Sequence, residues 1–276
     1  MKKALFIILL LLFGIAESQT HRFFYEVKYK EDSTQTTHQK SFAVLDINPD
    51  ETKYYDYSFL EKDSLNKINQ SQNTSWTAQI PVTRKKNTNT NINFAFAGDQ
   101  LYSYPTQDVI EWKLSEETKK ISDFNAQKAT SNFGGRKWTA WFVKQIPFSE
   151  GPYKFTGLPG LIVSLEDSQN QFSFNLIKSK KIDKTYDTKN ILEVRYGNKP
   201  IMITEKMFIK KSLEYYQDPY QQDREDLKKG NTVVEIEGVK YTKASDLIPL
   251  IKDEQEYIRK HNNPIERNKA INYPVK

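Results

Sequence analysis

The sequence predicts a mainly β protein of the β-rich α+β class, in which an antiparallel meander curls into a half-barrel or barrel and C-terminal helices follow. Apolar and polar residues alternate with a period of two from His21 to about Lys178, as in half-buried strands. Short connections separate these runs, which favours hairpins over the long crossovers of parallel strands. Aromatic residues make up 13% of the 276-residue chain, a content that suits a β-rich core.

The first 18 residues have the order of a signal peptide. Lys2 and Lys3 precede the apolar run Ala4–Phe13, and Ala16 and Ser18 supply the small residues of a cleavage site. The apolar run is shorter than the ~20 residues of a membrane-spanning helix. We therefore expect cleavage after Ser18 and an exported protein, periplasmic or secreted, that does not span the membrane. No cysteine stands at the junction, so we expect no lipoprotein anchor.

Residues 19–263 are predicted to form a single β-rich domain with about ten to twelve strands. The predicted strands are Phe23–Tyr29, Phe42–Ile47, Tyr55–Phe59, Trp76–Arg84, Asn91–Ala97, Leu101–Tyr104, Val109–Leu114, Phe124–Asn132, Lys137–Ile146, Leu161–Glu166 and Phe172–Ile177. A short helix is expected within Glu61–Asn73. So many twisted strands cannot stay flat, and the sheet should curl. Its interior would then hold an acyl chain or apolar peptide, or be filled by the protein's own side chains.

The last third of the chain is predicted to contain two helices. Thr204 is a plausible N-cap for a helix near 204–217, which Asp218 and Pro219 would end. A polar segment, Gln221–Asn231, leads to a small hairpin at Val233–Thr242, and a second helix is expected near 245–261. Residues 264–276 should form a polar tail that frays.

Glycine and proline concentrate in the middle of the chain, from Gly134 to Asp167. Proline fixes φ near −65° and glycine tolerates positive φ, so Pro159 and Gly160 predict a type II turn over Leu158–Leu161. The strand before the loop is apolar on both faces, which predicts a central position. The residues assigned a motif or structural role are Gly151, Pro152, Gly157, Leu158, Pro159, Gly160, Leu161 and Ile162. The candidate binding surface consists of the aromatic residues Trp138, Trp141, Tyr153 and Phe155.

The run WTAWFVKQIPFSEGPYKFTGLPGLI resembles the GLPGLI family, named for the six residues Gly157–Ile162, and the preceding FNAQKATSNFGGRK is similar to it as well. The resemblance is dense over residues 121–179 and implies an exported protein of a Gram-negative envelope. It implies no activity, because the family has no assigned biochemical function. Asn125 and Ala126 stand where some relatives have a cysteine. By fold-level analogy, the predicted half-barrel with a covering helix also resembles the envelope lipoprotein-carrier fold.

No set of residues forms a recognisable catalytic or cofactor site. The chain has no cysteine, so disulfides, thiolate metal sites and a cysteine nucleophile are excluded. His21, His38 and His261 lie too far apart in sequence for a metal motif, and we expect no metal and no cofactor. The formal net charge of +6 comes from lysines scattered among acidic residues, which argues against nucleic-acid binding.

Three functional hypotheses remain open from the sequence. The leading one is a non-catalytic envelope protein that binds an apolar ligand, such as a lipid or apolar peptide, or a protein partner. The first alternative is a periplasmic hydrolase that uses paired carboxylates. The second is a structural subunit that docks through the GLPGLI loop and therefore exposes an apolar patch.

Overall fold

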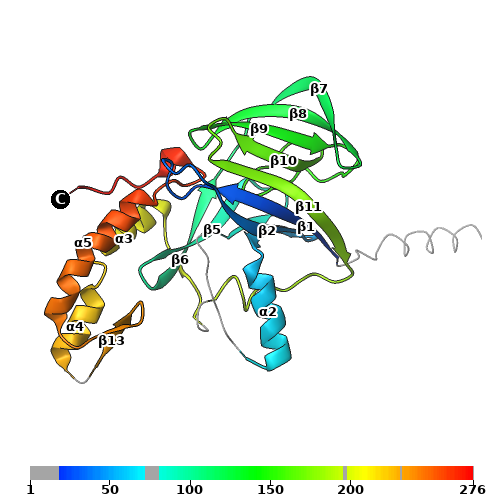
Figure 1. Cartoon of the computed structure of the whole chain (residues 1–276). Helices are drawn as coiled ribbons and strands as arrows, with labels where there is room; N and C mark the ends of the chain where they lie inside the picture. The colour runs from blue at the N-terminus through cyan, green and yellow to red at the C-terminus, as the bar shows by residue number, and fades with distance from the viewer. Residues whose placement is uncertain (1–18, 72–80, 195–197, 231, 276) are drawn as a thin grey trace, which may run out of the picture.

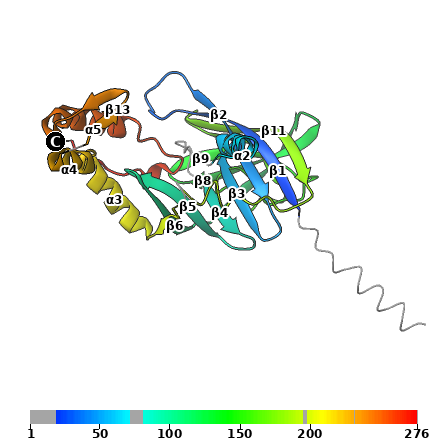
Figure 2. The ribbon, with the colours of Figure 1, turned by 90° about the horizontal axis from the view of Figure 1, so that it is seen from below.

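The computed structural model describes residues 19–71, 81–194, 198–230 and 232–275 (Figure 1). The predicted signal peptide and residues 76–80 of one predicted strand lie outside these ranges. Within them, twelve strands form one sheet, and two short strands form a separate hairpin. Four helices accompany the strands, three of them gathered with the hairpin at one end of the sheet (Figures 1 and 2). The protein is therefore mainly β with C-terminal helices, as the sequence predicts.

The strands of the large sheet are β1 (Thr20–Tyr29), β2 (Gln39–Ile47), β3 (Glu51–Asp56), β4 (Val82–Lys85), β5 (Thr90–Ala97), β6 (Gln100–Gln107), β7 (Lys113–Ile121), β8 (Phe124–Phe133), β9 (Arg136–Val143), β10 (Leu161–Asp167), β11 (Phe172–Ile182) and β12 (Ile201–Met202). The other elements are α2 (Ser58–Asn69), α3 (Glu205–Gln217), α4 (Gln221–Lys229), β13 (Val234–Ile236), β14 (Val239–Tyr241), α5 (Ile248–Lys260) and the 3-10 turns Ala244–Leu247 and Arg267–Lys269.

The sheet consists of two antiparallel meanders that meet at β1. The strand order is β12-β6-β5-β4-β3-β2-β1-β11-β10-β9-β8-β7, so that β1 pairs with both β2 and β11. The short edge strand β12 runs parallel to β6, after a connection long enough for a crossover. The sheet is thus mixed, whereas the sequence predicts a purely antiparallel meander.

Chain connectivity forces the sheet to curl. From β6 to β7 the strand order counts ten spacings, or roughly 48 Å in a flat sheet. The connection between these strands, residues 108–112, can span only about 20 Å. The two ends of the sheet must therefore approach each other, as a half-barrel requires. Among the described residues β6 and β7 do not pair, and the barrel stays open.

The connection between β9 and β10, residues 144–160, fills the concave side of the sheet. The buried ring of Phe155 packs edge-on against Trp138 at 4.7 Å between centroids and against Phe133 at 5.3 Å. Leu158 is buried in the same core, and the Tyr25 hydroxyl donates a hydrogen bond to the carbonyl oxygen of Ile162 at 2.7 Å. The protein's own side chains thus occupy much of the interior.

A second apolar cluster lies on α2 and the strands beside it. Phe59 and Leu60 of α2 pack with Val44 and Tyr55, and with Ile191 and Leu192 from the segment that follows β11. A buried ion pair lies beside this cluster: Arg22 Nε is 2.6 Å from Asp46 Oδ1.

Several local predictions differ from the structure. The Tyr55–Phe59 strand ends at Asp56, and α2 begins at Ser58 rather than after Glu61. The Val109–Leu114 strand starts only at Lys113, because residues 108–112 form the crossing between the two ends of the sheet. The polar segment Gln221–Asn231 contains α4, which buries Leu227 and is supported by i,i+4 hydrogen bonds from Gln221 and Gln222.

The Leu158–Leu161 segment is not a type II turn. The Gly160 N–H donates to the carbonyl oxygen of Leu158 at 2.8 Å, which closes a three-residue γ-turn around Pro159. The Leu161 N–H, which a type II turn would use, donates instead to the carbonyl oxygen of Ile146 at 3.1 Å. Pairing with the neighbouring chain segment therefore decides the geometry of the bend.

Gly160→Ala should destabilise the protein severely. The added Cβ would lie 2.3 Å from the carbonyl oxygen of Val143, at a φ of +151°. Clash and backbone strain together should lower the free energy of unfolding by about 3 kcal/mol or more. Gly238→Ala is the control, because Gly238 also has positive φ but no atom within 4 Å, and it should cost about 1 kcal/mol. Urea denaturation measures the free energy of unfolding of both variants. Equal losses would contradict the close packing of Gly160 against Val143.

Candidate functional site

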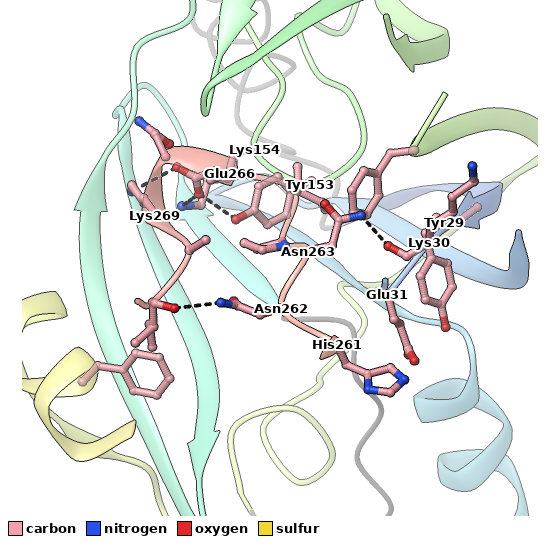
Figure 3. A pocket seen from close by; sticks show the side chains of 18 of the residues that line it. Tyr29, Lys30, Glu31, Tyr153, Lys154, His261, Asn262, Asn263, Glu266 and Lys269 are labelled. Carbon is pink, nitrogen blue, oxygen red and sulfur yellow. Dashed lines mark hydrogen bonds and ion pairs between the residues drawn. The ribbon is translucent and has the colours of Figure 1, made fainter. Parts of the chain in front are cut away.

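A cavity of about 580 Å³ lies between the large sheet and the C-terminal part of the chain (Figure 3). We call it the C-terminal cavity. Its sheet side is formed by residues of β1, β3, β6 and β11, and its other side by α3, the end of α5 and residues 261–271. Most of its wall is aromatic or aliphatic: Val27, Tyr54, Phe172, Phe174, Phe208 and Ile209.

The C-terminal segment is held against the sheet by Arg136, the first residue of β9. Its guanidinium donates to the carbonyl oxygens of Ile265 at 3.0 Å and Pro264 at 2.9 Å, and to Asn263 Oδ1 at 2.5 Å. Further along, the Tyr216 hydroxyl donates to the carbonyl oxygen of Pro274 at 2.6 Å. The segment after Pro264 is therefore docked instead of frayed, because side chains distant in sequence satisfy its backbone carbonyls.

The glycines of the β8–β9 turn make room for this segment. Gly134 has a φ of +63°, and its carbonyl oxygen accepts a hydrogen bond from the Asn268 N–H at 3.1 Å. A Cβ at Gly134 would lie 2.8 Å from Glu266 Cα, so the backbones meet where only glycine fits.

The inner end of the cavity holds a buried lysine between two carboxylates. Lys154, which is 1% exposed, lies 3.2 Å from Asp108 Oδ2 and 2.5 Å from Glu266 Oε1. The Tyr153 hydroxyl also donates to Glu266 Oε1, at 2.7 Å. Lys269 completes the group through Glu266 Oε2 at 3.0 Å and Glu205 at 3.1 Å (Figure 3). The charged groups thus neutralise one another across segments far apart in sequence.

The electrostatics of this cluster favour its charged form. Burial alone would raise the pKa of Asp108, but the Lys154 ammonium and hydrogen bonds from Thr106 and Asn91 outweigh burial and lower it. Burial likewise opposes the charge on Lys269, yet the Glu266 carboxylate raises its pKa above the ordinary value. Burial and the nearby Glu266 carboxylate hold the pKa of Tyr153 well above its ordinary value, so that this hydroxyl remains a donor.

The outer part of the cavity is aromatic. Tyr104 stacks on Phe208 of α3 at 4.8 Å between ring centroids, and both side chains line the cavity. Tyr257 and His261 stand at the end of α5, where His261 Nδ1 lies 2.8 Å from the carbonyl oxygen of Tyr257. An apolar wall that ends in a few oriented polar groups is typical of a binding site for a small organic molecule.

The structure brings three of the four residues of the candidate binding surface together but buries them. The Phe155 ring lies 4.7 Å from Trp138 and 6.5 Å from Tyr153 between centroids. Trp141 is also buried, with Lys119 Nζ placed 4.0 Å from its ring centroid. Of the four, Tyr153 alone lines the C-terminal cavity. Side chains packed over the faces of β9 cover the tryptophans, so these four residues do not form one exposed surface.

The glycine- and proline-rich motif is part of the packed core. Leu158, Leu161 and Ile162 are buried in the core, and Gly151 packs so closely that a Cβ there would lie 2.7 Å from the Ile162 side chain. The apolar side chains of the GLPGLI loop are therefore not available as a docking patch. The charged residues of the cavity, Lys154 above all, are not among the residues predicted from sequence, although a lysine between Tyr153 and Phe155 was a readable clue.

Within the described ranges, no group of three or more histidine, cysteine, aspartate or glutamate side chains could hold a metal ion. No helix within those ranges has the length and apolar character needed to cross a bilayer.

Comparison with known proteins supports the fold and gives a short match to the model of a family of unknown function. Residues 132–164 match the model of a family described as "Protein of unknown function (Porph_ging)". No curated protein matches the sequence. Structures of PNGF-II in the C2 and P21 space groups are similar to this chain, with TM-scores of 0.53 and 0.52 at 16% identity. They cover 71% and 70% of this chain, which spans a third (33%) of the PNGF-II chain. At this identity the likeness shows the fold alone.

Gly134→Ala should release the C-terminal segment. The clash with Glu266 and the positive φ should loosen residues 262–272, and their amide hydrogens should exchange at least about tenfold faster. Hydrogen exchange with mass spectrometry measures this, with β1 and β11 as internal references. Gly230→Ala, at a positive-φ glycine with no atom within 4 Å, should leave that segment unchanged. Unchanged exchange at 262–272 in Gly134→Ala would show that the segment does not depend on this turn.

Asp108→Asn should remove part of the acid sensitivity of the fold. The folded-state pKa of Asp108 is lowered, so its stabilisation is fully present above its unfolded pKa of about 3.9 and is lost as pH falls through the folded value. At pH 7 the free energy of unfolding of the variant should be about 3 kcal/mol lower than that of the wild type, because Lys154 keeps a buried charge with one partner fewer.

Urea denaturation from pH 7 down to pH 2.5 measures the difference in the free energy of unfolding between the wild type and Asp108→Asn. This difference should shrink below about pH 4. Asp253→Asn, at an exposed position on α5, should follow the wild-type curve. A difference for Asp108→Asn that stays constant with pH would exclude titration of this carboxylate.

Proposed function

We propose that the protein is an exported, non-catalytic binding protein that takes up an apolar or amphipathic small molecule, such as an acyl chain, in the C-terminal cavity. Export rests on the signal-like order of residues 1–18. The observation that carries the binding function is the cavity of about 580 Å³ with an aromatic and aliphatic wall. Its volume lies within the range of roughly 300–1,000 Å³ that is usual for ligand pockets.

The lining also fits an amphipathic ligand better than a fully apolar one. Phe172, Phe208 and Ile209 provide apolar contact, whereas the Tyr153 hydroxyl and the Lys269 ammonium belong to the polar group around Glu266. Polar groups held by Glu266 are already oriented and need little reorganisation when a head group arrives.

The hydrolase hypothesis has less support at this site. Asp108 and Glu266 are the carboxylates closest to acting as a pair here, but both form ion pairs with the same residue, Lys154. A general acid needs a raised pKa, and the pKa of Asp108 is lowered. The pair is therefore suited to hold a buried lysine rather than to transfer protons.

Ile209→Trp should block the C-terminal cavity. Ile209 lines the cavity and is 36% exposed, so the larger indole ring can enter the cavity without being forced into the core. We expect the affinity for the neutral apolar probe 1-N-phenylnaphthylamine, measured by fluorescence titration, to fall at least about tenfold. Met207→Trp is the matched control, because Met207 lies on the same helix, is 40% exposed and does not line the cavity.

Native mass spectrometry of mildly purified protein adds an independent measurement. A bound molecule that is present in the wild type and in Met207→Trp, and absent in Ile209→Trp, would support the proposal. Equal probe affinity in all three proteins would place binding elsewhere and refute this function for the C-terminal cavity.

A further inference from the structure

A second cavity, of about 700 Å³, lies near the start of β1 and beside the GLPGLI loop. We call it the N-terminal cavity. It shares no lining residue with the C-terminal cavity. Its wall comes from the first residues of β1, the β2–β3 and β4–β5 turns and the loop at 147–150, so four segments that are separate in sequence build it.

The wall of this cavity is rich in neutral hydrogen-bonding side chains. Amide and hydroxyl groups occur in all four of its segments, among them Gln19, Asn48, Thr52, Asn87, Thr88 and Ser149. Each amide carries both donors and acceptors, and each hydroxyl can donate and accept. The lining therefore differs in kind from the aromatic wall of the C-terminal cavity.

The charged groups at its floor neutralise each other. Arg84 and Glu150 form an ion pair, and Thr52 Oγ1 donates to Glu150 Oε1 at 3.2 Å. Arg84 also donates to Asn91 Oδ1 at 3.1 Å, which fixes the plane of the guanidinium. Burial, followed by the nearby Lys181 charge, lowers the pKa of His21, so this wall residue is neutral at pH 7. The floor thus offers fixed donors and acceptors without net charge, whereas Lys86 adds an exposed positive charge elsewhere in the wall.

One buried amide of this wall has a hydrogen-bond partner for its oxygen but none for its nitrogen among the described residues. Asn48 is 4% exposed, and its Oδ1 accepts a hydrogen bond from Thr20 Oγ1 at 2.6 Å. Its Nδ2 has no partner among the described residues, and neither does Gln19 Oε1, a second buried atom of a lining residue. Buried polar groups are normally paired, but both atoms are themselves buried, so a ligand in the cavity would reach them only after a side-chain rotation.

An aromatic face completes the wall. Phe148 packs against His21 at 4.7 Å between ring centroids and edge-on against Phe23 at 5.8 Å, which holds its ring in place at the cavity. A rigid ring beside planar polar groups suits a ligand that has hydroxyls along its edge and C–H groups on its face.

We propose that the N-terminal cavity binds a neutral carbohydrate. A sugar hydroxyl donates and accepts at once, as the amide and hydroxyl groups of the wall do, and the ring of a pyranose presents C–H groups to Phe148. An anionic ligand would find the Arg84 charge already used by Glu150 and only the exposed Lys86 left as a cation, and an apolar ligand would leave the polar wall unpaired. This proposal is independent of ligand binding in the C-terminal cavity.

Saturation-transfer difference NMR on the mature-length chain tests the proposal. The probes are maltohexaose, cellohexaose and chitohexaose, with oligogalacturonate as an acidic control and a blocked asparagine-containing tetrapeptide as the peptide control. At least one neutral oligosaccharide should bind, and Phe148→Ala should weaken it by roughly tenfold. Phe124→Ala, at an exposed phenylalanine on β8 that lines neither cavity, should have no effect.

Ser149→Trp keeps the test valid if Phe148→Ala unfolds the protein. Ser149 is exposed at the cavity wall, so an indole there should abolish binding without disturbing the core, whereas Ser168→Trp in the exposed β10–β11 turn should not. Loss of binding in Ser149→Trp, with binding retained in Ser168→Trp, supports the site. Absence of binding by every neutral oligosaccharide, binding of the peptide or acidic probe alone, or binding that survives Ser149→Trp would overturn it.

Discussion

The buried ammonium of Lys154 is the interaction on which the arrangement of the chain depends. Its partners come from two remote segments: Asp108 from the crossing between β6 and β7, and Glu266 from the C-terminal segment. Lys154 itself belongs to the loop inside the curled sheet. A single buried charge thus requires that the sheet curls, that the loop enters it and that the chain end returns to it. Removing one carboxylate leaves the buried ammonium with a single anionic partner, and breaking a buried ion pair costs about 3–5 kcal/mol.

Periodicity carries most of the fold, because alternation and helix capping are local properties of the sequence. The range of α3 follows from Thr204, whose Oγ1 accepts the Met207 N–H at 3.2 Å, and from the Asp218–Pro219 stop. Features set by distant partners could not be predicted in this way. The bend at Gly160 is a γ-turn because Ile146 takes the Leu161 N–H, and residues after Pro264 dock because Arg136 binds their carbonyls. Neither partner is visible in the local pattern.

The candidate site was harder to predict than the fold, for the same reason. Aromatic residues near the motif predicted a surface, but the Phe155 ring packs on Trp138, and Lys119 and Lys128 lie over Trp141, so both tryptophans are buried. The cavity walls are assembled from segments more than two hundred residues apart, such as those of Tyr29 and Asn263. Composition could indicate only that no cysteine or histidine chemistry was to be expected. Which lysine is buried, and beside which carboxylates, depends on the curvature of the whole sheet.

The loop inside the sheet also explains why the two cavities described above have walls of different character. A continuous lumen would have one kind of wall, whereas Phe155 and Leu158 fill the middle of this one. A chain of polar contacts crosses the filled region, from Glu150 through Arg84, Asn91 and Asp108 to Lys154. Such a chain couples two sites only if its members have two arrangements that ligands distinguish. Each member here is fixed by a partner on both sides, and we therefore treat the two cavities as separate sites that share a rigid wall.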